Sequence, residues 1–131
     1  MKFHLADTSR INIIRSYTDH EVIVNDRRYV ASLVVSANSI IDDWTPRRFD
    51  DLCEADFVEL GALEPELVIL GTGTRLRFPD PRLTLGLSSK RIGIEVMDSR
   101  AACRTYNILV AEGRHVMAAI LIEHPEDTAP D

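Results

Sequence analysis

Two short segments of the chain carry the residue types from which a binding or catalytic site is usually built. Gly71-Thr72-Gly73 follows the apolar run 67–70, and Glu95 and Asp98 end a second apolar stretch. The two carboxylates could work as a pair in acid–base chemistry. Alternatively, Asp98 caps a helix and Glu95 pairs with a nearby arginine. Caps and ion pairs are far commoner than catalytic pairs, which favours the second interpretation.

The spacing of the same residues also imitates a dinucleotide-binding fingerprint. Gly71-x-Gly73 follows a predicted strand, and Glu95 stands 24 residues after Gly71, where a ribose-binding acid would lie. However, Leu76 occupies the third glycine position, and the first helix-start signal comes only at Asp80-Pro81. Because a lone Gly-x-Gly is a weak signal, a tight turn after a buried strand is favoured and no cofactor is expected.

Further residues of the back half complete a predicted crevice at these strand ends. Asn107 is a poor interior helix residue, and we expect its amide to bind a neighbouring loop such as the 71–73 turn. Arginines of the region are expected to pair with acidic neighbours or to be solvated; the arginines are Arg104 and Arg114, and the acids are Glu95, Asp98 and Glu112. The predicted ligand-binding residues are Gly71, Thr72, Gly73, Glu95, Met97, Asp98, Arg104, Tyr106, Asn107 and Arg114.

No established catalytic or metal-binding pattern accompanies these residues. Ser88, Ser89 and Ser99 lack a Gly-x-Ser-x-Gly context. The four histidines have no His-x-x-x-His spacing and no cysteine near them, so a structural zinc site is not expected. No catalytic residue is therefore assigned.

Strands and helices alternate in the back half of the chain and must position the crevice. Asp80-Pro81 starts one helix, and Asp98 or Ser99 caps the next, which Gly113 ends. The predicted strands are 67–70, 91–96 and 115–122. A strand–helix–strand–helix–strand order gives right-handed parallel crossovers, and ligands bind such sheets beyond the carboxyl ends of the strands.

The front half has the pattern of short antiparallel strands. We expect these strands at 11–17, 21–24, 29–35 and 39–41, followed by a helix over 52–58 that Gly61 ends. Cys53 stands at the start of this helix, where Ser or Thr would cap better. The complete chain is therefore predicted to be a compact three-layer α/β domain. Its central sheet is mixed and mostly parallel, and an N-terminal antiparallel β-hairpin extends it.

Composition limits the class of protein. The 131 residues fit a single domain over 1–131, with an ordered core over 6–124 and a loose tail over 125–131. The net charge of −6 gives no general attraction to nucleic acid. The longest apolar run, 116–122, is too short for a transmembrane segment, and no targeting signal is visible. A cytoplasmic protein is expected.

Three further residues receive separate predictions. The cysteines, Cys53 and Cys103, are expected to be small buried hydrophobes, because they form no CxxC pair and no disulfide framework. Trp44, which is the only tryptophan, is either a core residue or an anchor for an interface.

Several motifs, taken in order, resemble a known family. They are Leu70-Gly71-Thr72-Gly73, Gly93-Ile94-Glu95-Val96-Met97-Asp98, Ala101-Ala102-Cys103-Arg104-Thr105-Tyr106-Asn107 and Glu112-Gly113-Arg114. The chain resembles the small domain of unknown function of archaea and bacteria, a family that includes the mitochondrial complex I (NADH dehydrogenase) assembly factor 3, and it looks like a bacterial member. The resemblance implies a three-layer α/β fold with a hairpin extension, no established catalytic residues, and help in assembling a membrane respiratory complex.

Three hypotheses on function follow. The first is a non-enzymatic binding or assembly-type protein with a protein partner, for which a membrane complex is a candidate; homo-oligomers stay open. The second is a small-ligand or nucleotide-binding protein, or an enzyme, that uses the crevice around Gly73 and Glu95. In the third, the glycines and polar helix residues serve only the fold.

Overall fold

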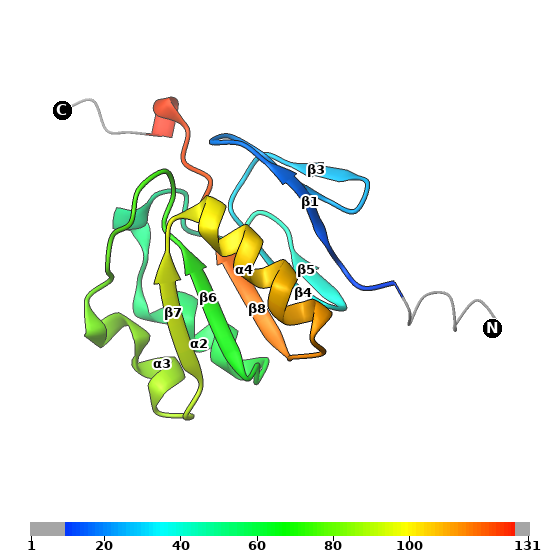
Figure 1. Cartoon of the computed structure of the whole chain (residues 1–131). Helices are drawn as coiled ribbons and strands as arrows, with labels where there is room; N and C mark the ends of the chain where they lie inside the picture. The colour runs from blue at the N-terminus through cyan, green and yellow to red at the C-terminus, as the bar shows by residue number, and fades with distance from the viewer. Residues whose placement is uncertain (1–9, 128–131) are drawn as a thin grey trace.

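The computed structural model describes residues 10–127, and Figure 1 shows the arrangement of their elements. The strands are β1 (Ile14–Tyr17), β2 (Val22–Val24), β3 (Arg27–Tyr29), β4 (Leu33–Ser36), β5 (Ser39–Ile41), β6 (Leu67–Gly71), β7 (Gly93–Met97) and β8 (Val116–Ile120). The α-helices are α2 (Glu54–Ala62), α3 (Leu85–Ser88) and α4 (Ser99–Ala111). Short 3-10 helices are η1 (Phe49–Asp51), η2 (Pro81–Thr84) and η3 (Pro125–Asp127).

The central sheet has the strand order β5-β4-β8-β6-β7. β6 pairs in parallel with both β7 and β8, whereas β4 pairs antiparallel with β8 and β5. A separate antiparallel sheet, β1-β2-β3, packs with α4 on one face, and α2 and α3 cover the other (Figure 1). The predicted mixed sheet, the layers on both of its faces and the antiparallel extension are confirmed.

Successive side chains of the central strands point to opposite faces of the sheet, and this alternation explains the three layers. Ile69 of β6 points into the core shared with α4, while Val68 and Leu70 point into the core shared with α2. All five residues of β6 and of β8 are buried, as a strand covered on both faces requires. The unbroken apolar runs in these two segments therefore predicted buried strands correctly.

The prediction of one strand over 29–35 is wrong, because the chain changes sheets there. β3 ends at Tyr29 in the small sheet, and β4 begins at Leu33 in the central sheet. The link is fixed by partners far away in the sequence: Ser32 O accepts from Trp44 N (2.7 Å), and Ser32 Oγ accepts from Ile122 N (3.1 Å). An apolar, β-branched run alone does not reveal such a break.

Two helix predictions also need correction. Gly61 does not end α2 but lies inside it, where a Cβ would stand 2.6 Å from the carbonyl oxygen of Gly86; the glycine lets α3 approach closely. Glu64 (φ 54°) then turns the chain in the left-handed region. The helix predicted from Asp80 onward is only η2 followed by the four residues of α3, although Asp80 caps η2 as expected.

The remaining local predictions concern Trp44, the two cysteines and the ends of the chain. Trp44 is 2% exposed and belongs to the core beneath α2, so its interpretation as an interface anchor is wrong. Cys103 is buried as predicted, whereas Cys53 is exposed at the start of α2. Residues 125–127 of the predicted loose tail form η3; the start of the predicted core at residue 6, and tail residues 128–131, lie outside the described range.

Candidate functional site

The carboxyl ends of β6, β7 and β8 meet at one edge of the central sheet. Thr72 N donates to Met97 O (2.9 Å), and Ser99 N donates to Gly73 O (2.8 Å). Leu121 N, just after β8, donates to Gly71 O (3.0 Å). The two segments that carry the predicted chemistry are therefore neighbours, as expected for adjacent parallel strands.

Gly71, the last residue of β6, and Gly73, in the turn after it, are both required by this close approach. A Cβ on Gly71 would lie 3.0 Å from the Cβ of Ala102 and 3.0 Å from Ser99, so a side chain here would push α4 away from the sheet. Gly73 has φ 95°, a conformation that residues with side chains rarely adopt. The glycines bring helix and strand together.

Asp98 and Ser99 are occupied by the backbone around them. Asp98 Oδ1 accepts from Ala101 N (2.9 Å) and caps α4, as the favoured interpretation predicted. Ser99 Oγ accepts from Gly73 N (2.8 Å) and donates to Leu121 O (2.9 Å), which joins all three strand ends. Glu95 is exposed and its side chain has no hydrogen bond or ion pair within residues 10–127, so the expected arginine partner of Glu95 is wrong.

The predicted residues of α4 serve the small sheet instead of the strand ends. Asn107 Oδ1 accepts from Ile14 N (2.9 Å) and its Nδ2 donates to Ile14 O (2.8 Å), so the expected bond to the 71–73 turn is wrong. The Asn107 amide thus gives β1 the pair of backbone hydrogen bonds that a neighbouring strand would otherwise supply. Tyr106 Oη donates to Asn12 O (2.7 Å), and burial raises the pKa of this phenol.

Neither of the two predicted arginines pairs with the acids proposed for it. Arg104 Nη1 donates to the hydroxyl of Tyr17 (3.0 Å) in β1. Arg114 pairs with Glu66 (2.9 Å) at the opposite end of the sheet. The pKa of Glu66 is lowered by its hydrogen bond with Arg114 and by the backbone N–H of His115.

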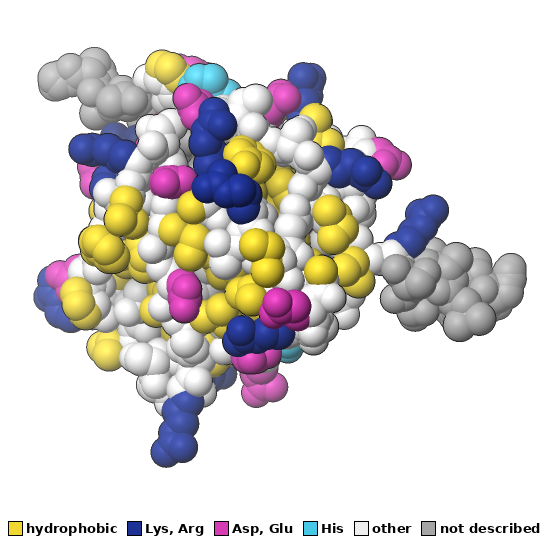
Figure 2. Space-filling model, in the orientation of Figure 1, with side chains coloured by type: hydrophobic (Ala, Val, Ile, Leu, Met, Phe, Trp, Pro, Cys, Tyr) yellow, Lys and Arg dark blue, Asp and Glu magenta, His cyan; other side chains and the backbone are white. Residues whose placement is uncertain are grey.

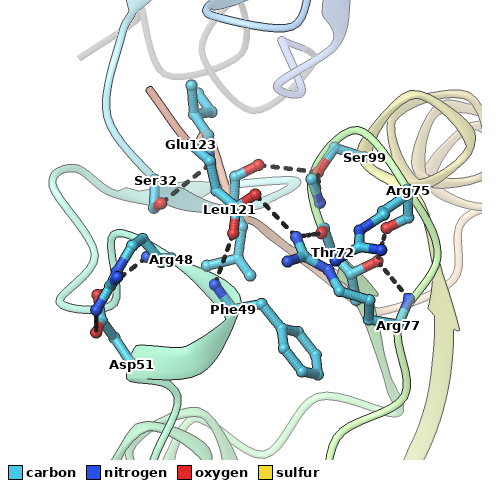
Figure 3. Close-up of polar contacts among 12 residues, drawn as sticks. Ser32, Arg48, Phe49, Asp51, Thr72, Arg75, Arg77, Ser99, Leu121 and Glu123 are labelled. Atoms are coloured by element: carbon cyan, nitrogen blue, oxygen red, sulfur yellow. Dashed lines mark hydrogen bonds and ion pairs between the residues drawn. The ribbon is translucent and has the colours of Figure 1, made fainter. Parts of the chain in front are cut away.

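Figure 3 shows a polar cluster at the strand ends that sequence reasoning missed. Arg77 Nη2 donates to Thr72 O (2.6 Å) and to Glu123 Oε1 (2.8 Å). Glu123 Oε2 accepts from Phe49 N (2.7 Å), and the Arg77 guanidinium lies 4.9 Å from the centre of the Phe49 ring. Both charged side chains are 22% exposed. No periodic signal links these residues, because Arg77 and Glu123 stand 46 positions apart.

The turn after β6 is shaped from inside by the same cluster. Thr72 Oγ1 donates to Arg75 O (2.7 Å) and accepts from Arg77 N (3.2 Å). Arg77 is consequently turned inward, while its neighbours Leu76 and Phe78 are turned out to solvent. In this segment the charged side chain is turned inward and the apolar side chains beside it are exposed.

One cavity adjoins the predicted crevice. It lies between the β1–β2 turn and the start of α4, is lined in part by Thr18, Gly73, Asp98 and Cys103, and has a volume of about 20 Å³. Such a volume holds about one water molecule. Of the ten predicted ligand-binding residues, only Gly73 and Asp98 line it, and their binding role stays a prediction.

The turn over this cavity is held by exposed contacts. Arg100 Nη2 lies 3.4 Å from Asp19 Oδ1, and its guanidinium lies 5.7 Å from the centre of the Tyr17 ring. Burial raises the pKa of the Cys103 thiol at the cavity wall to about 12, which keeps it protonated.

Within residues 10–127, no three His, Cys, Asp or Glu side chains gather as a metal site would need. None of the helices in this range has the length and apolar character needed to cross a bilayer.

Comparison with known proteins identifies the family. A model described as a protein of unknown function (DUF498/DUF598) matches residues 14–121. The chain belongs to this family. The resemblance read from the motifs is thereby confirmed.

Similar proteins agree with this family and with the fold. NADH dehydrogenase [ubiquinone] 1 alpha subcomplex assembly factor 3 of Bos taurus is 34% identical over 118 residues, which are 88% of this chain but only 63% of that protein. The 13 kDa major membrane protein of Francisella tularensis is 27% identical over 110 residues, covering 82% of this chain and 88% of its own length. A crystal structure of a Bordetella parapertussis protein superposes with a TM-score of 0.80, at 32% identity, over 86% of this chain and 97% of that one.

Proposed function

We propose that the chain is a non-catalytic binding protein that assists the assembly of a membrane-bound complex, with a respiratory complex of the NADH dehydrogenase type as the candidate. The similarity to a protein named as an assembly factor of that enzyme supports this proposal. The chain spans 63% of that relative, so the role of the whole relative enters here as a proposal and not as a finding.

The closed crevice is the observation that carries the non-catalytic part of the proposal. The polar side chains that gather at the strand ends already hold one another or the backbone: Asp98 caps α4, Ser99 joins three strand ends, and Glu123 holds Arg77. The cavity beside them has a volume of about 20 Å³. A substrate would have to displace bonds on which the turn after β6 depends.

The location of the protein extends the proposal. We place the protein in the cytoplasm, docked on a membrane complex through a protein partner. The two free cysteines, one of them exposed, suit a reducing compartment. The name of the Francisella relative, a major membrane protein, supports contact with a membrane or with a complex in it.

Partner capture from the native cells tests this function. The tagged chain is cross-linked in the cells, membranes are solubilised, and the captured proteins are identified by mass spectrometry. We expect subunits of one membrane complex to be enriched over cells that express the tag alone. Equal recovery with the tag alone would overturn the proposal.

A small-ligand function is the alternative, and one observation favours it. The β1–β2 turn over the cavity is held in part by the exposed Arg100–Asp19 ion pair, and exposed ion pairs contribute little to stability. Outward movement of the turn would enlarge the cavity. A ligand bound there raises the melting temperature of the folded protein, so a thermal-shift screen with nucleotides and metabolites tests the alternative. The absence of any shift would remove it.

A further inference from the structure

Among residues 10–127, β7 is an edge strand of the central sheet and has β6 as its single strand neighbour (Figure 1). Met97 O accepts from Thr72 N, so the backbone groups of Met97 face β6. Because these groups alternate along a parallel strand, those of Gly93 and Glu95 also face β6, and those of Ile94 and Val96 point outward. No other hydrogen bond within residues 10–127 reaches the outward groups. Two N–H and two C=O groups are therefore available to a further strand.

The segment that leads from β6 to α3 leaves the outward backbone groups of β7 without hydrogen bonds. Its residues 74–83 make no backbone hydrogen bond with β7. α3 contacts β7 from one face of the sheet and presents Leu85, whose side chain is exposed. A strand added to β7 would therefore meet free backbone groups and, on the α3 face, an apolar side chain.

The side chains of β7 make this edge apolar with a single acidic residue. Ile94 and Val96 are half-buried and pack into the core on the α2–α3 side. Glu95 points to the opposite face, is exposed, and is the only charged residue of the strand. Figure 2 shows hydrophobic and uncharged surface around an acidic side chain over β7, with no lysine or arginine next to it. The edge thus presents an unpaired negative charge between two apolar positions.

This charge disfavours a second copy of the chain as the added strand. Two β7 strands related by a twofold axis would pair antiparallel through Ile94 and Val96, which places Glu95 opposite Glu95 of the other copy. Like charges directly opposite each other on paired strands are destabilising, whereas opposite charges stabilise the pair. The same residue therefore selects a partner strand with a basic side chain at that position.

We propose that β7 is the docking edge of this protein for an extended segment of a partner protein, which carries a lysine or arginine opposite Glu95 and apolar residues on either side of it. The segment joins the sheet through the outward backbone groups of Ile94 and Val96. This inference rests on the proposed binding function and names the chemistry of the partner. Main-chain hydrogen bonds supply the affinity, and Glu95 supplies the specificity.

A pair of synthetic peptides tests the edge directly. The probes are acetyl-Thr-Val-Lys-Val-Thr-amide and the same peptide with glutamate in the centre, each added to the full chain labelled with nitrogen-15. We expect the lysine peptide to shift the amide resonances of Ile94 and Val96 and to slow their hydrogen exchange. The glutamate peptide is expected to bind about fivefold more weakly, which is the size of one cross-strand charge effect.

Charge reversal in the protein supplies the matched control. In Glu95→Lys the preference should reverse in favour of the glutamate peptide, and in Glu95→Gln it should disappear. N-methylation of the peptide amides that face β7 should abolish binding without any change in the protein. Shifts that avoid Ile94 and Val96, or a preference that survives Glu95→Lys, would overturn the proposal.

The outcomes separate this inference from the proposed function. If partner capture succeeds but the peptides leave β7 unchanged, the function stands and the docking edge is wrong. If the peptides bind as described but capture recovers nothing, the assembly role is wrong and the edge stands.

Discussion

Gly73→Ala measures how strongly the polar cluster at the strand ends depends on the turn after β6. Gly73 has φ 95°, and a Cβ there would lie 2.9 Å from Arg77 Nη2 and 2.9 Å from Glu123 Oε1. The substitution therefore adds backbone strain and also pushes apart the pair that joins the turn to the end of β8. Gly113→Ala is the matched control, because Gly113 has φ 83° and nothing within 4 Å of the added Cβ.

The two variants should differ by the free energy of the displaced pair. A left-handed alanine costs about 1–2 kcal/mol, and the stiffer unfolded chain returns about 0.4–1 kcal/mol, so Gly113→Ala should cost about 1 kcal/mol. At Gly73 the loss of charge-assisted hydrogen bonds adds about 1.5–3 kcal/mol. Urea unfolding checks this. With a slope of about 2 kcal/mol per M, the midpoint should fall by about 0.5 M for Gly113→Ala and by about 1.5 M for Gly73→Ala.

Equal midpoints for the two variants would refute the reasoning, because the pair would then have moved at no cost. A second comparison guards against unrelated strain at Gly73. In an Arg77→Met background the extra cost of Gly73→Ala should vanish, since the pair is already gone. An undiminished cost in that background would also contradict the account.

Other consequences of the structure can be checked with simple assays. A thiol reagent at pH 8 should label Cys53 in the folded protein and spare Cys103, whose pKa is raised to about 12 by burial; equal labelling before unfolding would contradict this. Arg91→Gly should stabilise the protein by about 0.5–1 kcal/mol in urea unfolding, since Arg91 has φ 61°; a lower midpoint would count against the strain. The pKa of Glu66 is lowered by Arg114, so its contribution to stability is present above the ordinary pKa of a glutamate and is lost as the pH falls through the lowered value. Glu66→Gln should therefore be less stable than the wild type at pH 7, with the difference shrinking as the pH falls below the ordinary pKa of a glutamate, and a constant difference would contradict the pairing.

The elements that could be predicted are those whose own residues decide their environment. β6 and β8 are apolar throughout and buried on both faces, and Asp98 caps α4 with a local bond. Prediction failed where the partner is distant. Asn107 was expected to bind a neighbouring loop such as the 71–73 turn, but its partner is Ile14 in β1, which stands 93 positions away. No local pattern distinguishes that partner from the nearer turn.

The candidate site shows the same limit more sharply. Glycines after a buried strand predicted a close approach, and the approach is present at Gly71. What fills the space is a charged pair: Arg77 comes from a segment predicted only as a loop, and Glu123 follows the last predicted strand. A sequence pattern can therefore locate an edge of a sheet where polar groups meet, but it does not show whether those groups face a ligand or one another.

The difference between these two possibilities changes where a function should be sought. At the ends of the parallel strands, Asp98, Ser99 and Glu123 are each held by several bonds, and a ligand there would compete with the fold. Along the side of the same sheet, the outward backbone groups of β7 have no hydrogen-bond partner within residues 10–127, and neither has the side chain of Glu95. A ligand that breaks hydrogen bonds of the fold costs more free energy than a partner that binds groups which the fold leaves unbonded. The free edge of the sheet is consequently the better place for a partner than its closed end.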